Sequence, residues 1–172
     1  MKVYKFGGAS VKDASGVRNL REIIACAGDD LMVVISAMGK TTNALERVVA
    51  ALAQKDEATA DNEWLAVLDY HVHLAMELGL KPNEDIRFPM MPEYDHTCSY
   101  DQNYDQIVSQ GEILSTQIVA VYLLKSGIRT EWWNMPKLLR TDNTFREAQV
   151  DMQTSAQVIR AGWDRPNRPS VV

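Results

Sequence analysis

A lysine and two glycines follow one another closely near the start of the chain, in KVYKFGGASV (residues 2–11). Two adjacent glycines allow backbone N–H groups to approach whatever lies above the turn, and a nearby cation favours an anionic ligand, with phosphate as the first candidate. Lys5, Gly7 and Gly8 therefore predict a phosphate-binding turn. The alternative is a tight strand-to-helix turn in which Lys5 is only a surface charge.

Two later polar stretches, SAMGKTTN (residues 36–43) and SQGEILS (residues 109–115), also interrupt apolar surroundings. The second places Gly111 and Glu112 inside an expected helix, where a glycine is destabilising by about 1 kcal/mol relative to alanine, so we expect another backbone or a ligand to come close there. If the stretches pack together, lysines and backbone N–H groups face a carboxylate and hydroxyls. Such a pocket would suit a zwitterionic substrate and a phosphate donor.

The elements that must position these residues alternate between helix and strand patterns. Apolar residues recur three or four apart over residues 11–27, which predicts an amphipathic helix, and LMVVIS (residues 31–36) is a continuous apolar run typical of a strand buried on both faces. Further helices are expected over residues 44–54, 62–80, 107–127 and 150–163, strands over 128–134 and 168–172, and a long irregular connection over 81–106.

This alternation predicts an α/β fold, a three-layer α/β/α sandwich with a mainly parallel sheet that is incomplete at the C-terminus. The loops after the first two strands would lie at the carboxyl edge of that sheet, where ligands bind in open α/β folds. The first two polar stretches are these loops.

Composition narrows the class of protein. With 172 residues, 46% hydrophobic and 24% charged, the chain is typical of one globular domain, and its net charge of -5 argues against a nucleic-acid partner. The apolar run at the start of the sequence, MKVYKF, is too short for a signal peptide. No stretch approaches the roughly 18 uninterrupted apolar residues of a membrane span, so a cytoplasmic location is expected. Cys26 and Cys98 lack the spacing of a zinc site or a disulfide framework.

Two common nucleotide motifs are missing from the sequence. Neither G-x-x-x-x-G-K-[ST] nor G-x-G-x-x-G has a match, which argues against a P-loop enzyme and an ordinary Rossmann dehydrogenase. By contrast KFGGASV, VVISAMGKTTN and SQGEILS, in this order and followed by WWNMPKLLRTDNTF, resemble the amino-terminal half of the aspartate kinases, which are members of the amino acid kinase superfamily. The resemblance covers nearly the whole chain. Ala9 departs from it, since the family more often has threonine there.

The resemblance implies roles at the glycine turn. Lys5 matches the family's catalytic lysine, which bridges toward the transferred phosphoryl group, and Gly7 and Gly8 would hold its oxygens through their N–H groups. Ser10 shares that turn. The implied cofactors are ATP and Mg²⁺ bound through the nucleotide, and catalysis would consist mostly of alignment and charge stabilisation.

The resemblance also implies a substrate, L-aspartate. Ser36 and Thr42 match hydroxyl contacts around it, and Glu112 matches the acidic residue that meets its α-ammonium group. The structural alternatives are helix capping for the two hydroxyls and a surface carboxylate for Glu112. Lys40 lies in the same loop and is expected to be solvated.

The family's enzymes are much longer, so the resemblance implies that residues 1–172 are the amino-terminal portion of a kinase domain, without the nucleotide-binding remainder and the regulatory ACT domains. The expectation is ATP-dependent synthesis of 4-phospho-L-aspartate by the complete enzyme, a homo-oligomer, with this portion inactive alone. Two alternatives stay open: another kinase of the superfamily, acting on glutamate, acetylglutamate or a nucleoside monophosphate, and a non-catalytic binding module.

Three further groups of residues invite a functional interpretation that we do not favour. DHTCSYD (residues 95–101) offers possible metal ligands on a loop with no second cluster. His71 and His73 are two residues apart, which on a helix means opposite faces, whereas a helical metal pair needs i, i+4 spacing. Trp132 and Trp133 adjoin in an expected strand, so they should face opposite ways and serve core packing.

Overall fold

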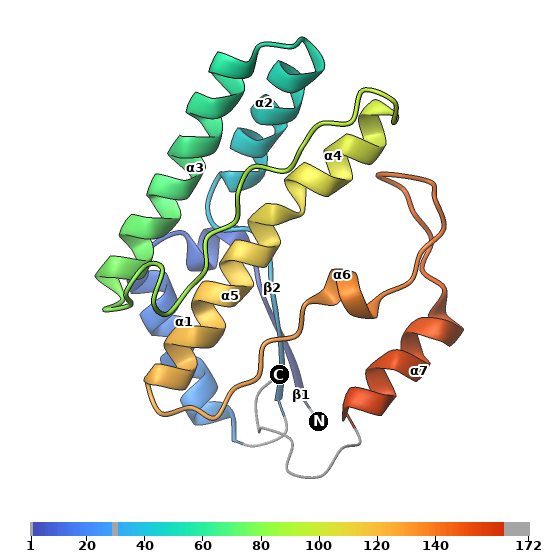
Figure 1. Ribbon diagram of the computed structural model, residues 1–172. Helices are drawn as coiled ribbons and strands as arrows, with labels where there is room; N and C mark the ends of the chain where they lie inside the picture. The colour runs from blue at the N-terminus through green and yellow to red at the C-terminus, as the bar shows by residue number, and fades with distance from the viewer. Residues whose placement is uncertain (1, 29–30, 164–172) are drawn as a thin grey trace.

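The computed structural model describes residues 2–28 and 31–163, and it begins with a β-α-β unit (Figure 1). Strand β1 (Lys2–Phe6) pairs in parallel with β2 (Leu31–Ile35), in a register that runs from Lys2 opposite Leu31 to Phe6 opposite Ile35. Helix α1 (Ala14–Ala27) connects the strands and follows a short 3-10 turn, η1 (Gly8–Val11). The expected parallel α/β arrangement of this part is confirmed.

Helix α1 begins three residues later than the apolar spacing alone predicts. The carboxylate of Asp13 accepts a hydrogen bond of 2.8 Å from the Gly16 N–H and so caps the helix. Val17, Leu20 and Ile24 form its buried face. The helix therefore has the amphipathic pattern read from the sequence, with its start fixed by the cap.

Helices α2 (Thr41–Ala53) and α3 (Glu57–Glu77) form a pair that extends beyond the strands (Figure 1). The carboxylate of Asp56 accepts from the Thr59 N–H, so α3 starts before the expected residue 62. A core cluster joins the two helices to the next pair, and its fully buried members include Leu45, Val48, Val49, Ala60, Ile107 and Leu114.

The helix expected over residues 107–127 is two helices, α4 (Tyr100–Val108) and α5 (Gln110–Lys125), which meet at Ser109. Helix α4 starts inside the segment expected to be irregular because the Ser99 hydroxyl caps it through the Gln102 N–H. Together they have the length and hydropathy that would permit a membrane span. However, the side chains of Ile107, Leu114, Ile118, Val119 and Leu123 are buried in the core, as is typical of the central helix of a globular domain.

The main core lies on one face of the sheet, where α1, α3 and α5 pack together against β2 (Figure 1). Leu31 and Ile35 point into it and are buried. Among the described residues the opposite face is less covered than the continuous apolar run predicts, because Val3 and Val34 are 55% and 46% exposed.

The strand expected over residues 128–134 is wrong, since residues 131–134 have no regular secondary structure. They lead into a one-turn helix, α6 (Met135–Leu138), and the last described element is α7 (Met152–Trp163), close to the expected helix. The strand expected over residues 168–172 lies outside the described residues.

Candidate functional site

The loops that follow β1 and β2 are hydrogen-bonded to each other. The Ser36 N–H donates to the Phe6 carbonyl at 3.1 Å, and the Gly39 N–H donates to the Gly8 carbonyl at 3.0 Å. The pairing of the strands therefore continues beyond the sheet, and the first two polar stretches form one layer at its carboxyl edge.

Gly8 lies where only a glycine fits. A Cβ atom on this residue would be 2.3 Å from the Ala37 carbonyl oxygen, far inside van der Waals contact. The two loops can be in direct contact because residue 8 lacks a side chain.

Lys5 directs its amine back over the glycine turn. Its Nζ lies 3.6 Å from the point where a Gly7 Cβ would stand, although Lys5 itself belongs to β1 and is exposed. Within the described ranges no carboxylate forms an ion pair with Lys5. A cation beside a glycine turn, without an acidic partner, fits the phosphate groups of a nucleotide.

The third polar stretch forms the first turn of α5 and packs directly on the second loop. Gly111 is buried, and a Cβ there would lie 3.1–3.2 Å from side-chain atoms of Ala37, Thr41 and Leu45. A close approach at Gly111 is therefore present, but it comes from side chains and not from the backbone or the ligand that we expected. The adjacent residue, Glu112, reaches the same loop, since the Ala37 N–H lies 3.4 Å from its Oε1.

Ser115 ties α5 to the second loop by a contact that sequence reasoning missed. Its side chain is fully buried and donates a hydrogen bond of 2.8 Å to the Ser36 carbonyl. The serine that ends SQGEILS was visible in the sequence, but a partner 79 positions away gives no local signal. The structure thus brings all three polar stretches together.

Neither Ser36 nor Thr42 caps a helix through its side chain. The N-cap of α2 is Lys40, with no side-chain capping bond, and Thr41 donates its hydroxyl to the Met38 carbonyl at 2.7 Å. Ser36 and Thr42 are half-buried, and in the part of the chain that the structure describes their hydroxyls have no protein partner. The capping alternative is therefore not what the geometry shows, and both hydroxyls are available to a ligand.

Ser10 and Lys40 lie at the rim of the site and are exposed. Ser10 lies in η1, where its N–H donates to the Gly7 carbonyl at 2.9 Å, and Lys40 lies in solvent at the start of α2. The solvated position expected for Lys40 is confirmed.

The possible metal ligands of residues 95–101 are used locally. One oxygen of Asp95 accepts from the N–H and the hydroxyl of Thr97, and these hydrogen bonds hold the pKa of the Asp95 carboxyl below its usual value. The other oxygen accepts from the Cys98 thiol. Among residues 2–28 and 31–163, no group of three or more histidine, cysteine or acidic side chains is arranged to hold a metal ion.

The two histidines of α3 face opposite ways, as their spacing predicts. His73 is exposed, whereas His71 is fully buried and donates from Nδ1 to the Val67 carbonyl at 2.7 Å. Among the residues that the structure describes, its Nε2 has no hydrogen-bond partner, and burial lowers the pKa of the His71 imidazole. His71 is therefore a neutral core residue.

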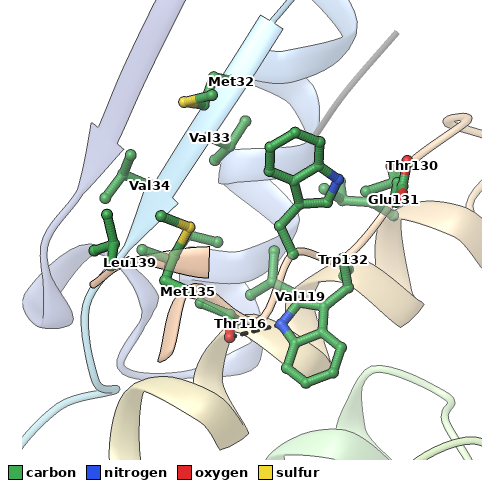
Figure 2. Close-up of a pocket in the computed structure, with 14 residues that line it drawn as sticks. Met32, Val33, Val34, Thr116, Val119, Thr130, Glu131, Trp132, Met135 and Leu139 are labelled. Atoms are coloured by element: carbon green, nitrogen blue, oxygen red, sulfur yellow. Dashed lines mark hydrogen bonds between the residues drawn. The ribbon is translucent and has the colours of Figure 1, made fainter. Parts of the chain in front are cut away.

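Trp132 and Trp133 do not face opposite ways, because they do not lie in a strand. Both line an apolar cavity of about 290 Å³ beside β2, and the Trp132 indole N–H donates to the Thr116 hydroxyl at 2.9 Å (Figure 2). Val34, Met135 and Leu139 also line this cavity (Figure 2). No residue of the three polar stretches lines it, so it is separate from the candidate site.

Comparison with known proteins identifies similarities over almost the whole chain. The model of the family described as "Amino acid kinase family" matches residues 1–166. Lysine-sensitive aspartokinase 3 of Escherichia coli (strain K12) is 27% identical over 164 residues, which are 91% of this chain and 36% of that protein. Aspartokinase 1, chloroplastic, of Arabidopsis thaliana is 29% identical over 179 residues, which are 94% of this chain and 30% of that protein.

Solved structures show the same fold. The chain aligns with E. coli aspartokinase III in complex with aspartate and ADP (R-state) at a TM-score of 0.78 and 20% identity, over 99% of this chain and 39% of that one. Clostridium acetobutylicum aspartate kinase aligns at a TM-score of 0.66 and 19% identity, over 93% of this chain and 36% of that one. The chain thus spans between 30% and 39% of the length of these matched proteins.

Proposed function

This chain belongs to the amino acid kinase family, and on that premise we propose that it forms the amino-terminal part of an ATP-dependent aspartate kinase. The reaction would transfer the γ-phosphoryl group of ATP to the side-chain carboxylate of L-aspartate and yield 4-phospho-L-aspartate, the first step toward lysine, threonine and methionine. The relatives whose names are aspartokinases support the choice of substrate.

One observation carries the proposal, the convergence of the three polar stretches. Lys5 lies over the glycine turn, which contacts the second loop. That loop carries two hydroxyls without a protein partner in the described part of the chain, and the carboxylate of Glu112 on α5 reaches it. This is the set of groups that a phosphate donor and a zwitterionic acceptor require.

At the phosphate end, Lys5 would stabilise the negative charge that spreads over the phosphoryl oxygens during transfer. Gly7 and Gly8 would offer backbone N–H groups to those oxygens, with Ser10 at the edge of the turn. The nucleotide supplies the transferred group, and Mg²⁺ bound to its phosphates would offset their charge. A side chain at residue 8 would collide with the neighbouring loop, so the glycine is what allows the turn to lie against the loop of Ser36.

At the acceptor end, Glu112 would bind the α-ammonium group of aspartate, while Ser36 and Thr42 would orient the substrate. Glu112 is exposed on the first turn of α5, so its carboxylate is accessible to a ligand. Because Ser115 and the Ala37 N–H tie α5 to the loop of Ser36, these groups are held at a fixed separation.

The wider context belongs to the same proposal. The proposed enzyme is cytoplasmic, assembles as a homo-oligomer and binds no nucleic acid, and the net charge of -5 supports the last of these points. Some of the relatives are chloroplastic. Another kinase of the family, or a non-catalytic binding module, would keep the fold and bind a different acceptor or none.

Calorimetric titration of the complete protein tests this assignment. We expect Lys5→Ala to weaken binding of Mg-ATP and Glu112→Gln to weaken binding of L-aspartate, each with little effect on the other ligand. Lys137→Ala, an exposed lysine on α6, serves as the control and should bind both ligands normally. Binding of neither ligand by the unmodified protein would support the non-catalytic module, and preference for glutamate would support another family member.

A further inference from the structure

Tyr70 reaches both loops of the candidate site from α3, thirty or more positions away in the sequence. Its hydroxyl donates a hydrogen bond of 2.5 Å to the carbonyl of Lys12, which ends η1 after the first loop. The same oxygen faces the second loop, because a Cβ on Gly39 would lie 3.0 Å from it. The end of one tyrosine ring therefore sits between the two loops.

Gly39 adopts the backbone conformation that this contact needs. Its φ is +57°, in the left-handed region that glycine enters without strain, and its N–H donates to the Gly8 carbonyl at 3.0 Å. The second loop thus turns with one side against Gly8 and the other against the Tyr70 hydroxyl. A displacement of Tyr70 would leave the hydrogen bond to Gly8 as the main restraint at this point.

The base of Tyr70 is anchored in the core. The residue is half-buried and packs against the main core cluster, and its helix buries Leu74 and Ala75 one turn further on. Burial, with a smaller effect from the Asp13 carboxylate, raises the pKa of the Tyr70 hydroxyl, so it remains a hydrogen-bond donor at neutral pH. A rigid helix therefore holds a permanent donor against the loops.

We propose that Tyr70 is a positioning residue that fixes the distance between the glycine turn and the loop of Ser36 and Thr42. The structural role of Tyr70 does not depend on the proposed function. Only its effect on catalysis, the alignment of a phosphate donor with its acceptor, rests on that function. In this proposal Tyr70 acts through the loops that it contacts and has no direct role in the reaction. Since alignment of two reactants contributes strongly to the rate of transfer, a small relaxation of the loops lowers turnover more than binding.

Hydrogen exchange at the Gly39 amide tests the structural part directly. Tyr70→Phe removes only the hydroxyl, and the exposed Lys12 carbonyl can bind water instead, so the variant should fold. We expect the Gly39 amide to exchange about five- to tenfold faster in this variant. This factor corresponds to the stabilisation of the loops by one hydrogen bond, the bond between the Tyr70 hydroxyl and the Lys12 carbonyl. Tyr122→Phe, which removes a half-buried hydroxyl from α5, is the matched control and should leave this amide unchanged.

Kinetics of the complete protein test the consequence. Tyr70→Phe should lower kcat about tenfold while KM for the acceptor stays within about twofold, a split that a general loss of stability does not produce. Gly39→Ala alone should lower kcat. It should lower kcat less when it is combined with Tyr70→Phe, because that change removes the oxygen that the new methyl group would meet. Unchanged Gly39 exchange in Tyr70→Phe would overturn the inference. If the unmodified protein has no kinase activity, the proposed function fails, while the exchange result still decides the role of Tyr70.

Discussion

Gly8 and Ala37 are in direct contact across the two loops of the candidate site, with the Ala37 carbonyl oxygen 2.3 Å from the place where a Gly8 Cβ would stand. Two strands of a parallel pair normally separate beyond their ends. Here the loops that follow them stay in contact, which brings the amine of Lys5 and the hydroxyl of Ser36 to the same edge of the sheet. The predictions below follow from this contact and from the residues that maintain it.

Gly8→Ala should destabilise the protein by about 1–3 kcal/mol, because the added methyl group forces the loops apart. Chemical denaturation measures the free energy of unfolding. Gly7→Ala is the matched control, since a Cβ there meets only the end of the Lys5 side chain at 3.6 Å and φ is -76°, which alanine adopts readily. Equal stability of the two variants would contradict the contact.

Ser115→Ala should destabilise the protein by about 1–3 kcal/mol, because it removes a buried donor from the Ser36 carbonyl. Ser109→Ala, on the exposed side of the junction between α4 and α5, should have a much smaller effect. Thermal unfolding of both variants checks the prediction. If they unfold together, Ser115 does not hold the loop.

Lys5→Ala and Glu112→Ala should affect different kinetic constants of the complete protein. Loss of Lys5 should reduce kcat about 10²–10³-fold with a smaller change in KM for aspartate, because its partner is charge that develops during transfer. Loss of Glu112 should mainly raise KM for aspartate, because the α-ammonium carries its charge before the reaction as well as during it. A raised KM for aspartate with an unchanged kcat in Lys5→Ala would refute the role given to Lys5.

His71 should make stability depend on pH in the acidic range. Burial lowers the pKa of its imidazole in the folded state, so below the usual histidine pKa of about 6.5 the unfolded chain binds a proton that the folded chain does not. The free energy of unfolding should therefore fall as pH decreases from about 6.5, by at most about 1.4 kcal/mol per pH unit from this residue. His71→Leu should reduce that slope, and His73→Leu should not. Equal slopes in both variants would mean that His71 is not the group responsible.

The sequence predicted the β-α-β unit and the three polar stretches correctly because both depend on local signals. Apolar spacing defines α1. Glycine at an unusual position is a sign of close packing, and Gly8 and Gly111 do pack closely against the second loop. The contacts that hold the site together were not predictable in this way. Ser115 and Tyr70 act on residues 79 and 58 positions away, and nothing in the neighbouring residues identifies those partners.

The errors in the helix and strand boundaries also have physical causes. Caps from Asp56 and Ser99 start α3 and α4 before the apolar pattern becomes clear. Residues 128–134 were expected to be a strand, and they contain isoleucine, threonine and tryptophan, which are residue types favoured in strands. In the structure both indoles line the cavity beside β2, and residues 131–134 have no regular secondary structure.

Formation of an acyl phosphate by the complete protein tests the central claim most directly. The product of incubation with Mg-ATP and L-aspartate can be trapped with hydroxylamine as aspartyl hydroxamate and quantified together with the ADP released. The account predicts equal amounts of hydroxamate and ADP, dependence on L-aspartate rather than glutamate or acetylglutamate, and loss of both products in Lys5→Ala but not in Lys137→Ala. Absence of hydroxamate with aspartate, or unchanged product formation in Lys5→Ala, would contradict it.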